Sequence, residues 1–586
     1  MGDDKISTYP TCNSHAELAD EMGKFYGDKI ELIRKDIDIA NPHRALPVDN
    51  PSYPLLSAFT DFKAVDDERV LKLVNDINNK HHPDDPIPVW LLKEKTETLL
   101  PLLKFIINKS FSEGCFPDAL KHGTIRPVLK DKDGDPESYQ NYRPVTNTPF
   151  LAKLIEKAAN NQLIEYLEEN KLFPSHQSAY RKQHSCETVM LKVVDDIQTL
   201  ISEKKMVMLV LLDLSSAFDT IDQDILLHKL FKNFGITGNA LKWIESYLKG
   251  RTFCVRIGNV NGKRCLLIYG VPQGTILGPL LFVIYIHDLV TVAEKYGLFI
   301  ELYADDSQWY VGFSPLTERS QAINNVQMCM VEVKEWMANN YLKVNFDKTD
   351  VLFLSNSLSH SIFYDHISCS IQGETFINKS DQSAKSLGVQ LDNKLSMKKM
   401  VSYCVKNCYL NLKKLGGIKR NLSKDIRLTM VKSYVISRLD FCNALYANVS
   451  KTLLNKLQNV MNACVRFIFD LQRDIDVKPF SKSAHILPVK SRIAYKLCSI
   501  VFKILHESAP SYLQDKVSYK SPLDTGINLR SILNTMMLEL PKYEHTCAYM
   551  MAKSWNDLPF SVRNCHTNIS FKKLLKTHYF SVEYGN

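Results

Sequence analysis

The sequence has 586 residues, of which 45% are hydrophobic and 23% charged, so it can bury a large core and exceeds one ordinary domain. Its formal net charge is +9, and the basic excess is concentrated beyond residue 391, which indicates a polyanionic partner or a basic solvated surface. The longest apolar runs, such as residues 207–212, are far shorter than the ~20 residues of a membrane span. The 14 cysteines lack metal-binding spacing, which argues against a zinc protein and is typical of a reducing intracellular compartment.

The first predicted elements are helical. Residues 15–37 place apolar side chains at helical spacing, and residues 96–114 predict a second amphipathic helix that ends near Gly114. Residues 124–130 have strand character, and residues 151–170 again show the periodicity of an amphipathic helix. Residues 1–110 contain no catalytic constellation, so we expect them to be a helical segment that precedes the functional part.

The central part of the sequence alternates strands and helices. The pattern predicts a buried strand at residues 206–214, a helix from residue 224, and a hairpin at residues 254–271 with its turn near Asn261 and Gly262. Three elements complete the order: one helix at residues 275–297, two short strands around a tight turn at residues 304–306, and a long helix at residues 316–340. This order predicts an α+β fold with an antiparallel sheet at its centre, the pattern of a polymerase palm.

Asp213 ends a run of seven residues that carry no polar side chain. A carboxylate that closes a buried strand is costly unless it is paired or bound to metal. Taken alone, Asp213 could equally be the N-cap of the helix that follows.

Two adjacent acids, Asp305 and Asp306, follow on an apolar hairpin. Adjacent acids at a turn are often only turn formers. Placed beside an acid that ends a neighbouring strand, however, they can hold two Mg²⁺ ions about 4 Å apart. Such a pair of ions activates a 3′-hydroxyl and stabilises the phosphorus centre of a phosphoryl transfer.

The motif order gives these acids their context. The segments LVLLDLSSAFDTIDQDILLHKL, YGVPQGTILGPLLFVIYIHDL and YADD occur in polymerase order and spacing, followed by LKVNFDKT and SLGVQLD. Upstream lie TIRPVLK, NYRPVTNTPFLAKLIEK and HQSAYRKQHSCET, and downstream SRLDFCNALY, LPVKSRIAYK and AKSWNDLPFSVR. Together they resemble the reverse transcriptases of non-LTR, LINE-type retrotransposons of the jockey-like kind, over nearly the whole chain.

This resemblance implies a right-hand polymerase with a helical thumb. The expected segments are an N-terminal helical segment at 1–110, fingers and palm at 111–391, a basic helical thumb at 392–470 and a C-terminal helical segment at 471–586. The family often carries an N-terminal endonuclease, and the residues before the fingers do not have that character. We therefore expect a separate endonuclease or a missing endonuclease domain.

The resemblance also implies the role of individual residues. The metal ligands would be Asp213, the backbone carbonyl of Leu214, Asp305 and Asp306, and Lys348 would be the general acid for departing pyrophosphate, unless it forms a structural salt bridge. The dNTP would contact Lys130, Arg143, Phe218, Gln273 and Gly274, with Phe218 excluding the ribose 2′-hydroxyl and Tyr303 packing beneath the primer end.

Each of these residues also has a structural interpretation. Phe218 and Tyr303 could be core residues, Lys130 and Arg143 solvated charges, and the PQG tripeptide an ordinary turn. Asp219 and Asp222, although near Asp213 in sequence, are interpreted as structural.

The expected function is RNA-directed DNA synthesis, in which dNTPs are added to a primer 3′-hydroxyl on an RNA template. The expected cofactors are two Mg²⁺ ions, with Mn²⁺ as an alternative. The partners are the RNA template, a DNA primer or target and dNTPs, without a membrane, and the family suggests nucleus and cytoplasm. The alternatives are a catalytically silent, domesticated or degenerate remnant that binds RNA, and an RNA-dependent RNA polymerase, which Phe218 and YADD disfavour.

Overall fold

The computed structural model divides the chain into two compact units that are interleaved along the sequence. Unit 1 consists of Met1–Gln177, Asp213–Lys295 and Cys329–Asp347, and unit 2 of Ser178–Leu212, Tyr296–Met328 and Lys348–Asn586. Within them, the structure describes residues 9–42, 58–78, 82, 85–130, 134–355, 368–371, 373–377, 382–520 and 536–585.

Unit 1 begins with a group of helices, of which only the first and the last were predicted from the sequence. These are α1 (His15–Ala40), α2 (Asp67–Asp76), α3 (Val89–Glu94) and α4 (Thr96–Glu113). The side chain of Ser14 accepts a hydrogen bond from the Glu17 amide and caps α1. Gly114 ends α4 in the left-handed conformation at φ 62°, as the sequence predicted, because glycine adopts this conformation without a steric penalty.

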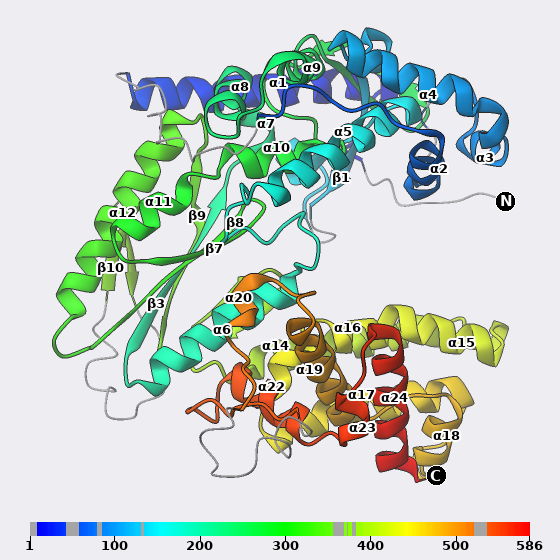
Figure 1. Ribbon diagram of the computed structural model, residues 1–586, viewed down its shortest axis with the longest axis vertical. Helices are drawn as coiled ribbons and strands as arrows, with labels where there is room; N and C mark the ends of the chain where they lie inside the picture. The colour runs from blue at the N-terminus through cyan, green and yellow to red at the C-terminus, as the bar shows by residue number, and fades with distance from the viewer. Residues whose placement is uncertain are drawn as a thin grey trace. The chain divides into compact units, whose positions relative to one another are not determined.

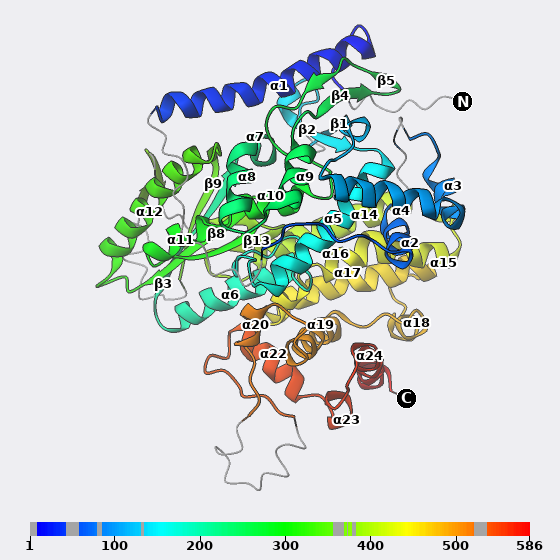
Figure 2. The same cartoon turned by 45° about the horizontal axis from the view of Figure 1, so that its top comes forward.

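The sheet of unit 1 has the strand order β2-β1-β4-β5, with β6 also paired to β4. Its strands are β1 (His122–Leu129), β2 (Tyr142–Asn147), β4 (Thr252–Ile257), β5 (Val260–Asn261) and β6 (Cys265–Leu266). Strand β1 pairs antiparallel with β2 and parallel with β4. Helix α1 runs along β4 and β5 (Figure 2), and its buried Leu18, Ala19 and Met22 share a core cluster with Val255 and Ile257.

The predicted position of the turn after β4 was wrong. The hairpin turns at Gly258 and Asn259, because Ile257 pairs with Val260 and Gly258 has a φ of 59°. The Asn261-Gly262 pair, a strong turn signal in sequence, lies against α1 instead. A Cβ on Gly262 would lie 2.8 Å from the carbonyl carbon of Ala19, so this glycine permits a close approach between helix and strand.

Further helices of unit 1 surround the loop from Gly270 to Gly274 or pack behind it. They are α5 (Phe150–Glu169), α7 (Ala217–Thr220), α8 (Gln223–Lys232), α9 (Gly238–Leu248), α10 (Gly278–Tyr285) and α11 (Leu289–Lys295). The single helix predicted over residues 275–297 is thus two helices. The interruption between them contains the buried Asp288, which pairs at 2.9 Å with the buried Lys229 of α8, while Lys229 also donates to the Tyr285 carbonyl at 2.7 Å. The two buried charges neutralise each other, and Lys229 also satisfies a carbonyl at the end of α10. The break between the two helices is therefore stable.

Unit 2 contains most of the central sheet, in the order β7-β8-β3-β9. Its strands are β3 (Met206–Leu214), β7 (Phe299–Tyr303), β8 (Asp306–Phe313) and β9 (Val344–Leu354). Strand β8 pairs antiparallel with both β3 and β7. Helix α6 (Cys186–Ser202) packs against β7 and β8 (Figure 1). The predicted antiparallel sheet is therefore confirmed.

The rest of unit 2 is largely helical, as predicted beyond Leu391. Two short ladders, β10 (Ser368–Ile371) with β11 (Glu374–Ile377) and β12 (Ser383–Ser386) with β13 (Val389–Asp392), precede the helices. The helices are α14 (Lys398–Gly416), α15 (Lys424–Val431), α16 (Ser437–Asp440), α17 (Lys451–Phe469), α18 (Lys478–Ser483), α19 (Val489–Leu505), α20 (Ser511–Gln514), α22 (Cys547–Asn556), α23 (Phe560–Arg563) and α24 (Asn568–Tyr584). They share one apolar core with α6 and β3. Helix α12 (Arg319–Asn339) begins in unit 2 and ends in unit 1.

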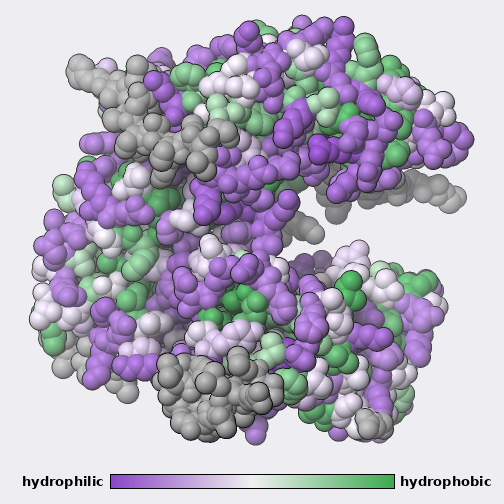
Figure 3. All heavy atoms as spheres, in the orientation of Figure 1, coloured by the Kyte–Doolittle hydropathy of each residue, from purple (hydrophilic) through white to green (hydrophobic). Residues whose placement is uncertain are grey.

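Hydrophilic side chains predominate on the face drawn in Figure 3, and the hydrophobic ones are scattered among them. Within the described ranges, none of the helices combines the length and the apolar character that a membrane span requires. The chain is thus a mixed α+β protein, and most of its buried apolar side chains lie in the cores of the two units.

Candidate active site

The YADD segment forms the tip of the hairpin between β7 and β8. Tyr303 pairs with Asp306, so the turn consists of two residues, Ala304 and Asp305. Ala304 has a φ of 57°, a left-handed conformation that a residue with a side chain adopts at some cost. Asp305 is half-buried and Asp306 is exposed. The strained turn therefore presents two adjacent carboxylates, and such strain is concentrated at functional sites.

Asp213 lies near the end of β3. Leu212, the residue before it in the strand, pairs with Ser307, the residue after Asp306. The Asn345 side-chain amide donates to the Asp213 carboxylate at 3.3 Å, and the Ser215 amide donates to the Lys343 carbonyl at 2.9 Å. These bonds fix the strand end that carries Asp213 and Leu214, both of which are half-buried.

The predicted acids supply carboxylate oxygens, the ligands that Mg²⁺ prefers. Within the described ranges, however, no three His, Cys, Asp or Glu side chains lie close enough together to hold a metal ion. The structure thus gives the register of the strands that carry the acids, but it does not contain an assembled metal cage.

The loop from Gly270 to Gly274 is held from two sides in unit 1. The Gln273 carbonyl accepts from the Thr146 amide of β2 at 2.8 Å, and the Gln273 side-chain amide donates to Asp219 at 3.1 Å. Gly274 has a φ of 105°, and a Cβ on it would lie 2.4 Å from the Thr146 carbonyl oxygen. Only glycine fits this position without a shift of the loop.

The residues that follow the loop are anchored by Glu156 of α5. This fully buried carboxylate accepts from the Ile276 amide at 2.7 Å, just before α10 begins. Burial raises the pKa of Glu156, while the nearby Arg251 opposes this shift. The loop is therefore fixed at Gln273 and again directly after Gly274.

Phe218 lies on α7, next to the same loop. Its half-buried ring stacks on Phe282 of α10, with ring centroids 4.5 Å apart. The Val271 amide donates to the Phe218 carbonyl at 3.0 Å. Phe218 is thus joined to the Gly270–Gly274 loop through the backbone and to α10 through its ring.

Asp219 has a closer link to the candidate site than the sequence indicated. From the sequence we expected a structural role, but the Asp219 carboxylate accepts a hydrogen bond from the Gln273 side-chain amide. Burial raises its pKa from 3.8 to about 6, against the opposing effects of Lys29, Gln273 and Lys130. Asp222, in contrast, has the structural role expected: it caps α8 and pairs with Arg34 at 2.6 Å.

Lys130 and Arg143 lie on the hairpin of β1 and β2. Both side chains are exposed, and the Lys130 ammonium donates to the Gln140 carbonyl at 2.7 Å. Arg143 pairs with Val128 across the strands. Side chains two residues apart lie on the same face of a strand, so Arg126, Val128 and Lys130 share one face of this hairpin. Arg126 is exposed like Lys130.

The two other predicted site residues lie in unit 2. Lys348 is exposed on β9. Tyr303 is half-buried at the end of β7, and burial together with a hydrogen bond to Cys186 raises its pKa. Tyr303 packs against the core of unit 2, which is compatible both with a core residue and with a residue beneath the primer end.

Comparison with known proteins identifies the central part of the chain. Residues 129–391 match the family model described as reverse transcriptase (RNA-dependent DNA polymerase). Residues 129–391 thus form a reverse transcriptase domain, and this domain is similar to that of jockey-like, non-LTR retrotransposons. All predicted site residues, from Lys130 to Lys348, lie inside this reverse transcriptase domain.

The curated relatives support the same family. The chain is 26% identical over 414 residues to the probable RNA-directed DNA polymerase from transposon BS of Drosophila melanogaster, covering 69% of this chain and 44% of the relative. It is 25% identical over 443 residues to the RNA-directed DNA polymerase from mobile element jockey of the same organism, covering 71% and 46%. The retrovirus-related Pol polyprotein from type-1 retrotransposable element R2 of Popillia japonica is 30% identical over 159 residues, or 27% and 22%. The chain thus spans less than half the length of these relatives.

Two further residues of the reverse transcriptase domain, Tyr180 and Arg126, were not predicted from the sequence but have surroundings that suggest a role. Tyr180 is half-exposed with a φ of 61°, and burial and the Asp305 carboxylate raise its pKa. Arg126 adds a third cation to the hairpin of Lys130 and Arg143. The alternation of buried and exposed positions along TIRPVLK could have revealed Arg126. Tyr180, in contrast, is recognised only in the structure, by its left-handed backbone and by its electrostatic interaction with Asp305.

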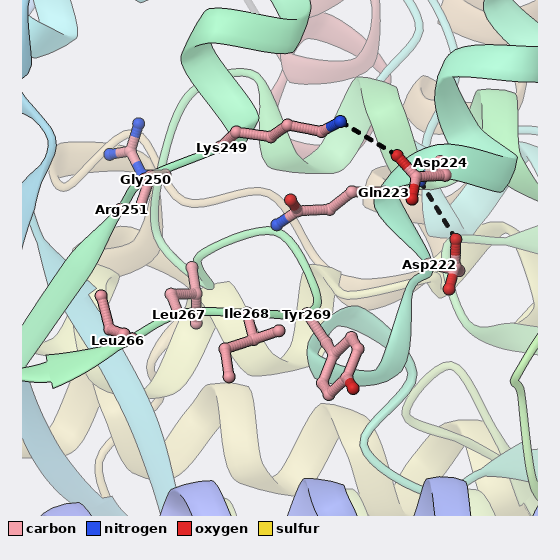
Figure 4. Close-up of a pocket in the computed structure, with 10 residues that line it drawn as sticks. All are labelled: Asp222, Gln223, Asp224, Lys249, Gly250, Arg251, Leu266, Leu267, Ile268 and Tyr269. Atoms are coloured by element: carbon pink, nitrogen blue, oxygen red, sulfur yellow. Dashed lines mark hydrogen bonds and ion pairs between the residues drawn. The ribbon is translucent and has the colours of Figure 1, made fainter.

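An open cavity of about 400 Å³ in unit 1 lies beside the candidate site (Figure 4). Gln223 extends into it between Lys249 and the segment from Leu266 to Tyr269, and Lys249 pairs with Asp224 at 3.1 Å. Gln223 also donates to the Gly270 carbonyl at 3.2 Å. None of the predicted substrate-binding residues lines this cavity, so it is separate from the proposed nucleotide contacts.

Proposed function

We propose that this chain catalyses RNA-directed DNA synthesis, adding dNTPs to the 3′-hydroxyl of a primer on an RNA template. The observation that carries the proposal is the strand register: the two-residue turn presents Asp305 and Asp306, and β3 continues into Asp213 directly after its last ladder pair with β8. An acid at each of these strand ends is the arrangement that two-metal nucleotidyl transfer requires. The reverse transcriptase family match supports the same chemistry.

Two Mg²⁺ ions, with Mn²⁺ as an alternative, would be held by Asp213, Asp305, Asp306 and the Leu214 carbonyl. All of these donors are oxygens, which fits a hard divalent cation. Asp306 is exposed and Asp305 half-buried, so their oxygens are accessible to ions and substrate. When bound, the ions would lower the pKa of the primer 3′-hydroxyl and stabilise the charge that develops on the phosphate.

The dNTP would lie against residues of unit 1. Lys130 and Arg143 offer cationic groups to the triphosphate, Arg143 in a bidentate geometry and Lys130 as a point charge. The anchored Gln273 would hydrogen-bond along the nascent base pair, and Gly274 would allow close approach of the backbone. The Phe218 ring, fixed by Phe282, would exclude a ribose 2′-hydroxyl and so select dNTPs.

Two residues of unit 2 complete the proposed set. Lys348, exposed on β9, would protonate the departing pyrophosphate. Tyr303 would pack beneath the primer terminus next to the metal-binding acids. Both roles follow the position of these residues in the motifs NFDKT and YADD.

The proposed right-hand organisation assigns residues 111–391 to fingers and palm, 392–470 to the thumb and 471–586 to a C-terminal segment. Helix α14 supports the thumb assignment, because it exposes Lys406 and Lys413 together with the rings of Tyr403 and Tyr409. Alternating cations and aromatic rings suit the phosphates and sugars of an RNA–DNA duplex.

A primer-extension assay tests the function. The purified chain is incubated with Mg²⁺ and oligo(dT) on poly(rA), with either dTTP or UTP. We expect extension with dTTP and little with UTP. Binding of the duplex without extension would contradict the proposal and favour the silent, RNA-binding remnant, and preferential use of UTP would favour an RNA polymerase.

A further inference from the structure

A buried charge network in unit 2 connects the C-terminal segment to the hairpin that carries Asp305 and Asp306. It begins at Glu301 of β7, which is 1% exposed and pairs with Lys192 of α6 at 3.0 Å. Lys192 also pairs with Asp196 at 2.8 Å. The hydroxyl of Tyr310, on β8, donates to Asp196 at 2.6 Å, so both strands of the hairpin are bound to α6.

The network is completed from the C-terminal segment. Lys516, two residues beyond α20, pairs with Asp195 of α6 at 2.9 Å and also contacts Asp196. Asp195 is 3% exposed, and its other carboxylate oxygen accepts from the Ala548 amide at 2.7 Å. Helix α20 lies against α6 in both views (Figures 1 and 2).

Lys516 limits the excess negative charge of this network to one. Two cations, Lys192 and Lys516, oppose three carboxylates, those of Asp195, Asp196 and Glu301. Removal of Lys516 would leave three acids against one cation in a largely buried place, where unpaired charge is expensive. The pKa of Lys516 is raised by Asp195 and Asp196 despite the opposing effect of burial, in agreement with a stable ammonium group there.

A second contact from α20 reaches the same hairpin through a loop. The Tyr512 hydroxyl bonds to the Ser178 hydroxyl at 3.0 Å and to the Thr188 hydroxyl at 3.1 Å. The Ser178 amide donates to the Leu302 carbonyl of β7 at 2.9 Å, one residue before Tyr303. Tyr180, beside Asp305, lies in this loop.

We propose that Lys516, assisted by Tyr512, is a positioning residue for the Asp305–Asp306 hairpin, so that the C-terminal segment is part of the catalytic apparatus. This inference rests on the proposed function, because the hairpin matters for catalysis only if it binds the metals. It assigns a role to the segment 471–586, for which the sequence analysis found none. The competing explanation is that the network contributes only to stability.

The test compares four variants of the intact chain. Lys516→Met removes the cation, Lys516→Arg retains it, and Lys516→Met with Asp195→Asn restores the wild-type excess of one negative charge, with one cation facing two acids. The asparagine oxygen can still accept from the Ala548 amide. Lys520→Met is the matched control, because Lys520 is exposed and lies four residues away.

Three measurements are made on each variant: the single-turnover rate of primer extension, the hydrogen exchange of peptides that cover residues 299–313, and the affinity for the RNA–DNA duplex. For Lys516→Met we expect the extension rate to fall about 10- to 100-fold, as for other small displacements of catalytic groups. Exchange in the hairpin should increase while RNA–DNA duplex affinity stays within about twofold. Lys516→Arg and the double variant should recover most of the rate, and Lys520→Met should match the wild type.

The exchange measurement separates this inference from the proposed function. If the wild type does not extend primers but Lys516→Met still loosens residues 299–313, the positioning role stands and the proposed function fails. Unchanged rate and exchange in Lys516→Met, or an equal loss in Lys520→Met, would overturn the inference. If Lys516→Met does not fold, Tyr512→Phe, which removes one hydroxyl, takes its place with the same expected pattern and the same contradicting result.

Discussion

The side-chain amide of Gln273 donates a 3.1 Å hydrogen bond to the carboxylate of Asp219. This bond joins the loop proposed to lie under the nascent base pair to the short helix that carries the proposed sugar gate. Since the Gln273 carbonyl is held independently by Thr146, Asp219 controls mainly the orientation of the Gln273 side chain.

Replacement of Asp219 should therefore affect nucleotide binding. Asp219→Ala removes the acceptor, and we expect the KM for dTTP to rise about 2- to 10-fold, the equivalent of one hydrogen bond. Asp219→Asn keeps an acceptor oxygen and should remain near the wild type. Steady-state extension on poly(rA)/oligo(dT) measures both, and equal KM values in the two variants would refute the orienting role.

Asp219 should also give the chain a pH-dependent stability. Its pKa is higher in the folded chain, about 6, than the ordinary value of 3.8. The folded state therefore binds more protons between these pH values, and the free energy of unfolding falls as the pH rises through this interval. Asp219→Asn carries no carboxylate that can ionise, so its free energy of unfolding does not fall in this way. The difference in free energy of unfolding between Asp219→Asn and the wild type should therefore increase from pH 4 to pH 7. Urea denaturation at several pH values measures the difference, and a constant difference would contradict the prediction.

Gly274 should not tolerate a side chain. Gly274→Ala would place a methyl group 2.4 Å from the Thr146 carbonyl oxygen at a φ of 105°, so the loop must shift. We expect extension to fall at least about 10-fold while the chain stays folded. The control is Gly416→Ala, because a Cβ there has no neighbour within 4 Å. Equal activity of the two variants would show that the loop position is unimportant.

Phe218→Ala should relax the choice of sugar. The ring is held by Phe282, so its removal opens space at the proposed 2′ position. We expect the ratio of kcat/KM for dTTP over UTP to fall at least about 10-fold, the equivalent of 1.4 kcal/mol. Phe282→Leu, which removes only the stacking partner, should reduce the ratio less. An unaltered ratio in Phe218→Ala would refute the gate.

The N-terminal helix should be essential for stability through Arg34. Arg34 is 7% exposed. Its guanidinium pairs with Asp222 at 2.6 Å and lies 3.8 Å and 3.4 Å from the ring centroids of Tyr269 and Tyr341. Arg34→Met should lower the free energy of unfolding by about 3 kcal/mol or more, because Asp222 is left without its cation. Adding Asp222→Asn, which preserves the helix cap, should recover part of this loss in urea denaturation. A double variant no more stable than Arg34→Met would contradict the role of the pair.

Patterns that are local in sequence predicted much of the fold. The apolar run before Asp213 gave β3, the YADD turn gave the hairpin, and Gly114 ended its helix where expected. Each of these elements depends on periodicity or on a preferred backbone conformation within a few residues.

The failures arose from contacts between distant residues. The Asn261-Gly262 turn signal was overridden by the packing of Gly262 on Ala19, and one predicted helix was broken by the pair of Lys229 and Asp288. The same limit hid the link of Asp219 to the candidate site, since Gln273 lies 54 residues away. Lys516 lies 320 residues from Asp196, so no local pattern could indicate their contact.

The most direct test of the central claim is primer extension by Asp305→Asn, with Glu335→Gln, an exposed acid of α12, as the control. The substitution removes one charge from the proposed metal ligands and changes the side-chain volume little. We predict that Asp305→Asn binds the RNA–DNA duplex like the wild type but extends it at least about 100-fold more slowly, while Glu335→Gln extends it normally. Extension by Asp305→Asn at the wild-type rate would contradict the account.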